Sequence, residues 1–125
     1  MIRIDDVDKY KKIFAEVARY AAQRTPIEAR KCMLINARDG NIEISASDGF
    51  KDILRTEKME GDLHVLVEAQ KISRVFDNFN QPVELSESDN GLRIKSGPTL
   101  MTISCRETSE VIGSLSSDGT SLTTN

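Results

Sequence analysis

The side chains able to do chemistry in this sequence are few and stand apart. His64 is the only histidine, and no serine or cysteine nucleophile is evident beside it. Nucleophilic catalysis needs a nucleophile and a base within hydrogen-bond reach, so we expect His64 to be structural or at the surface. The seven glycines are dispersed, and none belongs to a glycine-rich loop that cradles phosphates. The sequence therefore predicts a protein that is not an enzyme and uses no cofactor.

Residue types that bind metals are present without a metal-binding pattern. Asp39, Asp48 and Asp89 each stand beside glycine or asparagine, and turns explain such positions without a metal. Cys32 and Cys105 are the only cysteines, and two cysteines with one histidine cannot fill the four positions of a structural zinc site. We expect two buried structural thiols. A disulfide or a metal pair is the alternative.

Length and composition indicate one folded domain. The chain has 125 residues, of which 38% are hydrophobic and 30% charged, as in soluble globular proteins. Its 20 acidic and 17 basic residues give a net charge of −3, which argues against a histone-like DNA binder. No stretch approaches the roughly 18 apolar residues of a membrane span. The N-terminus has no signal sequence, so we expect a cytoplasmic protein with no membrane partner.

Two amphipathic helices are predicted among short strands. Residues 6–22 carry apolar side chains at helical spacing, as do residues 69–79. Alternating apolar segments predict strands at 32–35, 42–44, 50–54, 63–67, 83–85, 92–94 and 100–105. Glycine turns at 39–41 and 89–91 predict hairpins.

The two halves of the chain repeat the same order of elements. A strand, a helix and three strands up to about residue 57 match a second such series from residue 63 to residue 105. The order predicts an α+β fold of duplicated βαβββ units, with both helices on one side of antiparallel sheets. A chance match of element order is the alternative. We place this domain at residues 1–107 and treat the Ser/Thr-rich residues 108–125 as a tail or interdomain linker.

The face turned from the core is net positive on the first predicted helix and of mixed charge on the second. On a helical wheel the first presents Lys9, Lys12, Arg19 and Gln23, with Glu16 as the only acid. The second presents Gln70 and Arg74, flanked by Lys71 and Asn78, with Asp77 opposing them. A single surface Lys or Arg is usually only solvated. Two such helices on one surface would attract phosphates without reading sequence, because Lys and Arg pair with backbone oxygens.

The six aromatic residues are placed mostly as core. Four lie on apolar helix stripes, namely Tyr10, Phe14, Phe76 and Phe79. Phe50 heads a predicted strand, and only Tyr20 leans toward a polar side. The sequence therefore predicts no base-stacking platform for single-stranded nucleic acid.

Four segments, in their order and spacing, resemble the N-terminal domain of the bacterial DNA polymerase III beta subunit, the sliding clamp. They are residues 24–27 (RTPI), 39–48 (DGNIEISASD), 67–71 (VEAQK) and 92–97 (LRIKSG), and the similarity covers residues 1–107. In that family such domains join head to tail into a ring, with helices lining the inner wall and continuous sheet outside. Duplex DNA passes through the ring. The resemblance implies a processivity factor that tethers the replicative polymerase without chemistry of its own.

The resemblance also implies site residues and partners. Arg24 matches the basic residue that touches DNA in the family, in the loop after the first helix, and Lys71 matches a basic position at the start of the second helix. Lys12, Arg19 and Arg74 are added from the helical wheel. The implied partners are double-stranded DNA of any sequence and, through the full ring, DNA polymerase and the clamp loader. The pocket for partner peptides lies in later domains of the family, so we expect this chain to lack it.

The chain differs from clamp subunits, which have three such domains and close as dimers. We expect either a fragment of a longer subunit or a small natural protein, for instance phage-borne, of which six copies would close a ring. Closing the ring would then need further clamp domains or self-association. The alternative function is a clamp-like module that binds proteins through exposed edge strands, such as a modulator of ring assembly, and does not encircle DNA.

Overall fold

The computed structural model describes residues 1–21 and 28–106. Arg24 and the Ser/Thr-rich residues 108–125 lie outside the described residues, so the domain boundary at residue 107 stays a prediction. The described elements are β1 (Ile2–Ile4), α1 (Val7–Ala18), the short 3-10 helix η1 (Glu28–Lys31), β2 (Cys32–Arg38), β3 (Asn41–Ser47), β4 (Asp52–Lys58), β5 (Leu63–Glu68), α2 (Ala69–Phe76), β6 (Val83–Ser88), β7 (Gly91–Ser96), β8 (Thr99–Ile103) and β9 (Cys105–Arg106).

The strands form two antiparallel sheets, and the predicted repeat of βαβββ units is confirmed. One sheet has the order β1-β6-β7-β8 and the other the order β4-β3-β2-β5-β9. The first strand of each unit adds to the sheet of the other unit: Ile2 pairs with Leu85 on β6, and Leu66 on β5 pairs with Leu34 on β2. The two halves are therefore joined by strand exchange at both sheets.

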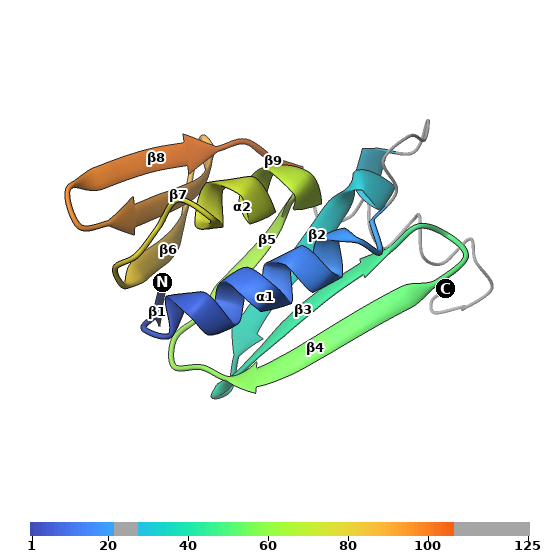
Figure 1. Cartoon of the computed structure of the whole chain (residues 1–125), viewed down its shortest axis with the longest axis horizontal. Helices are drawn as coiled ribbons and strands as arrows, with labels where there is room; N and C mark the ends of the chain where they lie inside the picture. Colours follow the sequence, from blue (N-terminus) through green and yellow to red (C-terminus); the bar gives the residue numbers. More distant parts are fainter. Residues whose placement is uncertain (22–27, 107–125) are drawn as a thin grey trace.

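Both helices lie side by side on the same side of the sheets (Figure 1). The carboxylate of Asp6 caps α1 by accepting a hydrogen bond from the Lys9 amide at 3.1 Å, which satisfies one of the free amides at the helix start. The inward stripe of α1 is buried as predicted and consists of Val7, Tyr10, Ile13, Phe14, Val17 and Ala18. On α2 the buried residues are Ala69, Ile72 and Phe76.

Aromatic rings join the two helices. The Phe14 and Phe76 rings meet edge to face with centroids 4.7 Å apart, and both side chains are fully buried. Phe79 packs on Phe76 at 5.9 Å, and Tyr10 on Phe14 at 6.0 Å. Such pairs add about 0.5–1.5 kcal/mol each beyond the area they bury. This row of four rings holds α1 against α2.

Both helices are shorter than the sequence predicts. After Ala18 the chain closes in tighter turns, because the amides of Tyr20 and Ala21 donate to carbonyls three residues back at 3.0 and 3.2 Å. The amides of Asn78 and Phe79 do the same beyond α2, at 3.1 Å each. Tight final turns of this kind commonly finish an α-helix while keeping the apolar stripe in register.

Two strand predictions also need correction. The predicted strand 100–105 is divided between β8 and β9, which belong to different sheets. Phe50 does not head a strand in the core: it stands in the turn between β3 and β4, and its side chain is 97% exposed. The alternation of apolar and polar residues does not distinguish the first residue of a strand from the last residue of a turn. The position of Phe50 could therefore not be predicted from the sequence.

Cys32 is buried, as predicted, whereas Cys105 is only half-buried. Burial raises the pKa of the Cys105 thiol. Within residues 1–21 and 28–106, no group of three or more His, Cys, Asp or Glu side chains is placed to hold a metal ion. Neither α1 nor α2 has the length and apolar character needed to cross a bilayer.

A matched pair of Phe→Ala variants tests this core. Phe14→Ala should lower the free energy of unfolding by about 3–5 kcal/mol, because it removes a fully buried ring and leaves a cavity between the helices. Phe50→Ala removes an identical ring that is exposed to solvent, so it should change the free energy of unfolding by less than about 0.5 kcal/mol. Urea denaturation followed by circular dichroism measures both. Equal losses for the two variants would contradict the placement of these rings.

Candidate nucleic-acid interface

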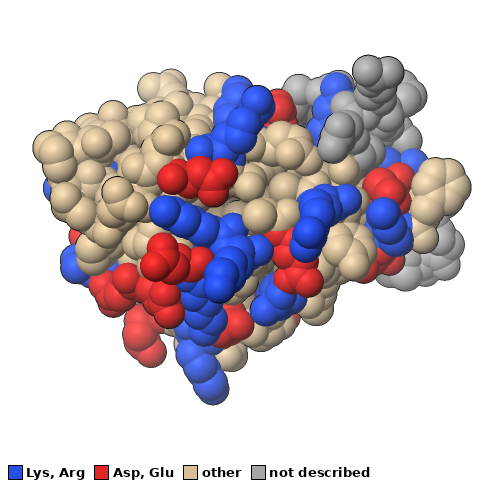
Figure 2. Space-filling view, viewed as in Figure 1, with Lys and Arg blue, Asp and Glu red and all other residues tan. Residues whose placement is uncertain are grey.

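The exposed sides of α1 and α2 form one continuous surface, called the helix wall here. Figure 2, viewed from the same side as Figure 1, shows Lys and Arg side chains gathered over the two helices, with Asp and Glu side chains among them. Four of the predicted DNA-binding residues are on this wall with exposed side chains: Lys12, Arg19, Lys71 and Arg74. The fifth, Arg24, lies outside the described residues.

Most acidic groups near α1 are already paired. The Lys9 ammonium lies 2.5 Å from the Glu57 carboxylate on β4, and Lys11 lies 4.0 Å from Asp8 on the same helix. Glu16, the only acid on the predicted outer face of α1, forms an ion pair with Arg55 of β4. Each pair leaves almost no net charge for a distant ligand.

The cations that remain are the predicted ones. Lys12, Arg19, Lys71 and Arg74 form no ion pair with any described residue, although the Arg74 Nε donates to the Gln70 carbonyl at 3.3 Å. Asp77 follows α2 directly and is the exposed acid nearest in sequence to Arg74. The helix wall thus keeps an excess of positive charge on a chain whose total charge is −3.

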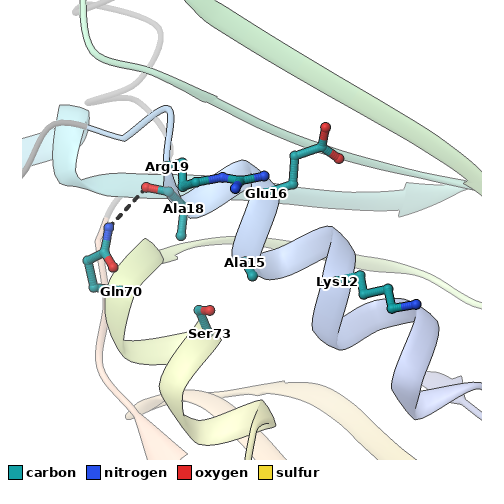
Figure 3. A pocket seen from close by; sticks show the side chains of 7 residues that line it. All are labelled: Lys12, Ala15, Glu16, Ala18, Arg19, Gln70 and Ser73. Atoms are coloured by element: carbon teal, nitrogen blue, oxygen red, sulfur yellow. Dashed lines mark hydrogen bonds between the residues drawn. The ribbon is translucent and has the colours of Figure 1, made fainter.

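A groove runs along the seam between the helices. It has a volume of about 480 Å³ and is lined by Lys12, Ala15, Glu16, Ala18, Arg19, Gln70 and Ser73. Figure 3 shows Lys12, Ala15 and Arg19 on α1, with Gln70 and Ser73 across from them on α2, while Glu16 points away from α2. The Gln70 amide donates to the Ala18 carbonyl at 2.9 Å, which fixes the end of α1 to the start of α2.

The groove combines small side chains with flanking charge. Ala15 and Ser73 leave room at its centre. Lys12 and Arg19 are seven residues apart, so they stand about 10 Å apart along the helix axis. A phosphate chain can approach the wall closely at the small residues while its charge meets a cation on either side. Such contacts read the phosphate backbone and not the bases.

Two features of this surface were missed by the sequence reasoning. Arg55 neutralises Glu16 from a different element, and local spacing carries no signal for a partner 39 residues away. Gln70 was expected to face solvent, but it is half-buried because it binds the end of α1. Both contacts depend on which strand and which helix end lie beside α1, and only the tertiary packing decides that.

Comparisons with known proteins place the fold. No protein-family model and no curated protein matches the chain. Among solved structures, the DNA polymerase sliding clamp from Bacillus subtilis matches with a TM-score of 0.80 at 17% identity, over 87% of this chain and 32% of that one. The beta subunit from DNA polymerase of Streptococcus pyogenes matches with a TM-score of 0.79 at 13% identity, over 86% of this chain and 30% of that one.

A DnaN sliding clamp, DNA polymerase III subunit beta, from Bartonella birtlesii matches with a TM-score of 0.76 at 20% identity, over 83% of this chain and 29% of that one. The present chain thus spans about a third of the length of the clamps that it matches. Matches at sequence identities this low show the fold alone. The expected resemblance is confirmed at that level: the chain has the fold of DNA sliding clamps.

Proposed function

We propose that this chain is a DNA sliding-clamp domain, a processivity element without catalytic chemistry that surrounds duplex DNA once a ring is assembled. One observation carries the proposal: after ion pairing, the cations left on the two helices stand together on one wall of an acidic chain. A positive wall on a negative protein attracts a polyanion in one orientation only. The helix wall therefore faces the duplex in this proposal.

The contact with DNA is sequence-independent. Lys12, Arg19, Lys71 and Arg74 meet phosphate oxygens, which are the same at every base pair. Weak, uniform contacts let a protein slide along the duplex. By analogy with the named clamps, the assembled ring would tether a replicative DNA polymerase and be placed by a clamp loader in the cytoplasm.

Two open sheet edges offer a way to assemble. Among the described strands, β4 and β8 are long edges at the ends of different sheets, whereas β1 is bridged at Ile2 by Gly61. Each long edge carries an exposed leucine: Leu54 on β4 is 59% exposed, and Leu100 on β8 is 53% exposed. Pairing β8 of one domain with β4 of the next extends the sheets head to tail. The neighbour would be a further clamp domain or a second copy of this chain.

Paired charge-removal variants test the DNA contact. Lys12→Ala with Arg19→Ala should weaken binding to short duplexes of every sequence alike. The slope of log affinity against log salt should fall by about 2, since each lost phosphate contact contributes about 0.9. Fluorescence anisotropy over a salt series measures both quantities.

The control for this variant is Arg93→Ala with Lys95→Ala. It removes the same charge from exposed positions on β7, whose neighbours Leu92 and Ile94 face the core. It should leave DNA affinity nearly unchanged. Equal losses in the two double variants would mean that net charge alone drives binding, and a loss confined to certain sequences would argue against phosphate contacts.

The Glu16–Arg55 ion pair gives a second test. Arg55→Met should weaken duplex binding, although Arg55 is on a strand, because it leaves the Glu16 carboxylate uncompensated on the helix that carries Lys12 and Arg19. Adding Glu16→Gln should restore the affinity. The same anisotropy assay measures this rescue, with Arg93→Met as the matched charge control. A double variant as weak as Arg55→Met would show that Arg55 acts in another way.

Edge variants test assembly. If copies of this chain associate, Leu54→Asp and Leu100→Asp should each shift the mass measured by light scattering toward that of one chain. Phe50→Asp adds the same charge at an exposed apolar residue outside the edge strands, so it should not. A wild-type chain that stays monomeric at every concentration contradicts ring closure by copies of this chain. If that monomer also binds no DNA at low salt, the protein-interaction module is favoured.

A further inference from the structure

The turn between β3 and β4 carries an aromatic side chain that neither the core nor the helix wall uses. Phe50 is 97% exposed, whereas the other exposed large apolar side chains, Met1, Leu54 and Leu100, are 53–63% exposed. Scattered surface apolar residues are ordinary. A phenyl ring that has nearly all of its surface in water and stands on an ordered turn is well placed to contact a ligand.

Hydrogen bonds fix the turn that presents Phe50. The Asp48 carboxylate accepts from the amide of Phe50 at 2.8 Å and from that of Lys51 at 2.9 Å, and the Ser47 hydroxyl accepts from the Gly49 amide at 3.1 Å. The hydrogen bonds from the Lys51 and Phe50 amides lower the pKa of Asp48, because they stabilise its ionised form. The ring therefore leaves the turn in a defined direction.

Contacts on two sides hold this turn, one to Tyr20 just past α1 and the other to η1. The Lys51 ammonium lies 5.5 Å from the centre of the Tyr20 ring, a cation–π contact just past Arg19. Gly49 has a φ of +95°, and a Cβ there would lie 2.5 Å from the Arg30 guanidinium of η1. The turn thus lies beside Tyr20, two residues past the end of the helix that carries Lys12.

We propose that Phe50 is a stacking site for an unpaired DNA base, placed at the end of the helix wall. The proposal rests on the proposed function, because the wall brings DNA to this end of the domain. A phenyl face stacks on any base, so the contact needs no sequence. Two cations belong to or touch this turn: Lys51 follows Phe50 in sequence, and the Arg30 guanidinium lies against Gly49.

A base suits this ring better than a partner protein does. Aromatic anchors of protein interfaces sit within a patch of apolar neighbours that exclude water. Here the flanking residues are Asp48, Gly49, Lys51 and Asp52, and the only other exposed large apolar residue on β4 is Leu54. A lone exposed ring matches the arrangement by which single strands are held, with one base stacked on one aromatic face. Where duplex meets single strand, the site would therefore bind the first unpaired bases.

A tryptophan probe gives a direct test. The chain has no tryptophan, so Phe50→Trp introduces a single fluorophore at the site. Stacking should quench its emission on adding oligo(dT) or a duplex with a single-stranded overhang, and a blunt duplex should quench it much less. If neither oligo(dT) nor overhang DNA quenches the tryptophan at concentrations at which the DNA binds the chain, the proposal is overturned. Phe50 would then be interpreted as a contact for a partner protein.

Affinities provide the second arm. Phe50→Ala should weaken binding to overhang DNA about fivefold or more, the lower end of what removal of one stacking ring costs, and leave blunt-duplex affinity unchanged. Asn90→Ala removes an exposed side chain from the turn between β6 and β7, away from the helix wall and the open sheet edges, so it serves as the control and should alter neither. If Phe50→Ala binds both DNAs as wild type does, the stacking site is refuted while the clamp function stands. If the wild type binds no duplex at all, the clamp function fails, and the oligo(dT) quench still decides the stacking site by itself.

Discussion

The contact between Phe14 and Phe76 determines whether this chain has a helix wall at all. Each ring is fully buried, and their edge-to-face packing joins α1 to α2 directly. The two helices come from different halves of the chain, and this shared core brings their outer faces together as one surface. The hydrogen bond from Gln70 to Ala18 then fixes how the helix ends meet. The groove, the spacing of the cations and the orientation of the wall all follow from that packing.

The second constraint is the placement of acids. An acidic chain presents a basic surface only if its carboxylates are used elsewhere, and here they are. Asp6 caps α1, Asp48 closes a turn, and Glu57 and Glu16 form ion pairs with Lys9 and Arg55. Exposed pairs of this kind add little to stability, commonly less than about 1 kcal/mol. Their value here is electrostatic, because they remove negative charge from beside the wall.

Much of the fold could be predicted from the sequence, because periodicity reports which side of each element is buried. The stripe through Tyr10, Phe14 and Val17 and the hairpin at Asp39-Gly40 follow from spacing and turn chemistry. The repeat predicted two βαβββ units, but the exchange of their first strands has no local signal. The position of Phe50 was wrong for a related reason, since exposure at the end of a strand depends on what the rest of the chain covers. Of the site, the four wall cations were found, while Arg55 and the Gln70 contact needed the tertiary packing.

The exchange of β1 and β5 ties the two halves into a single folding unit. Pairing Ile2 with Leu85 closes nearly the whole described chain into one loop, so the four-stranded sheet is completed only after the second half has formed. Neither half can fill its own sheet, because each lends its first strand to the other. Contacts so distant in sequence slow folding, because the chain loses conformational entropy in closing the loop before it gains the free energy of strand pairing. In return, separating α1 from α2 would require breaking strand pairs in both sheets as well as the contact between the helices.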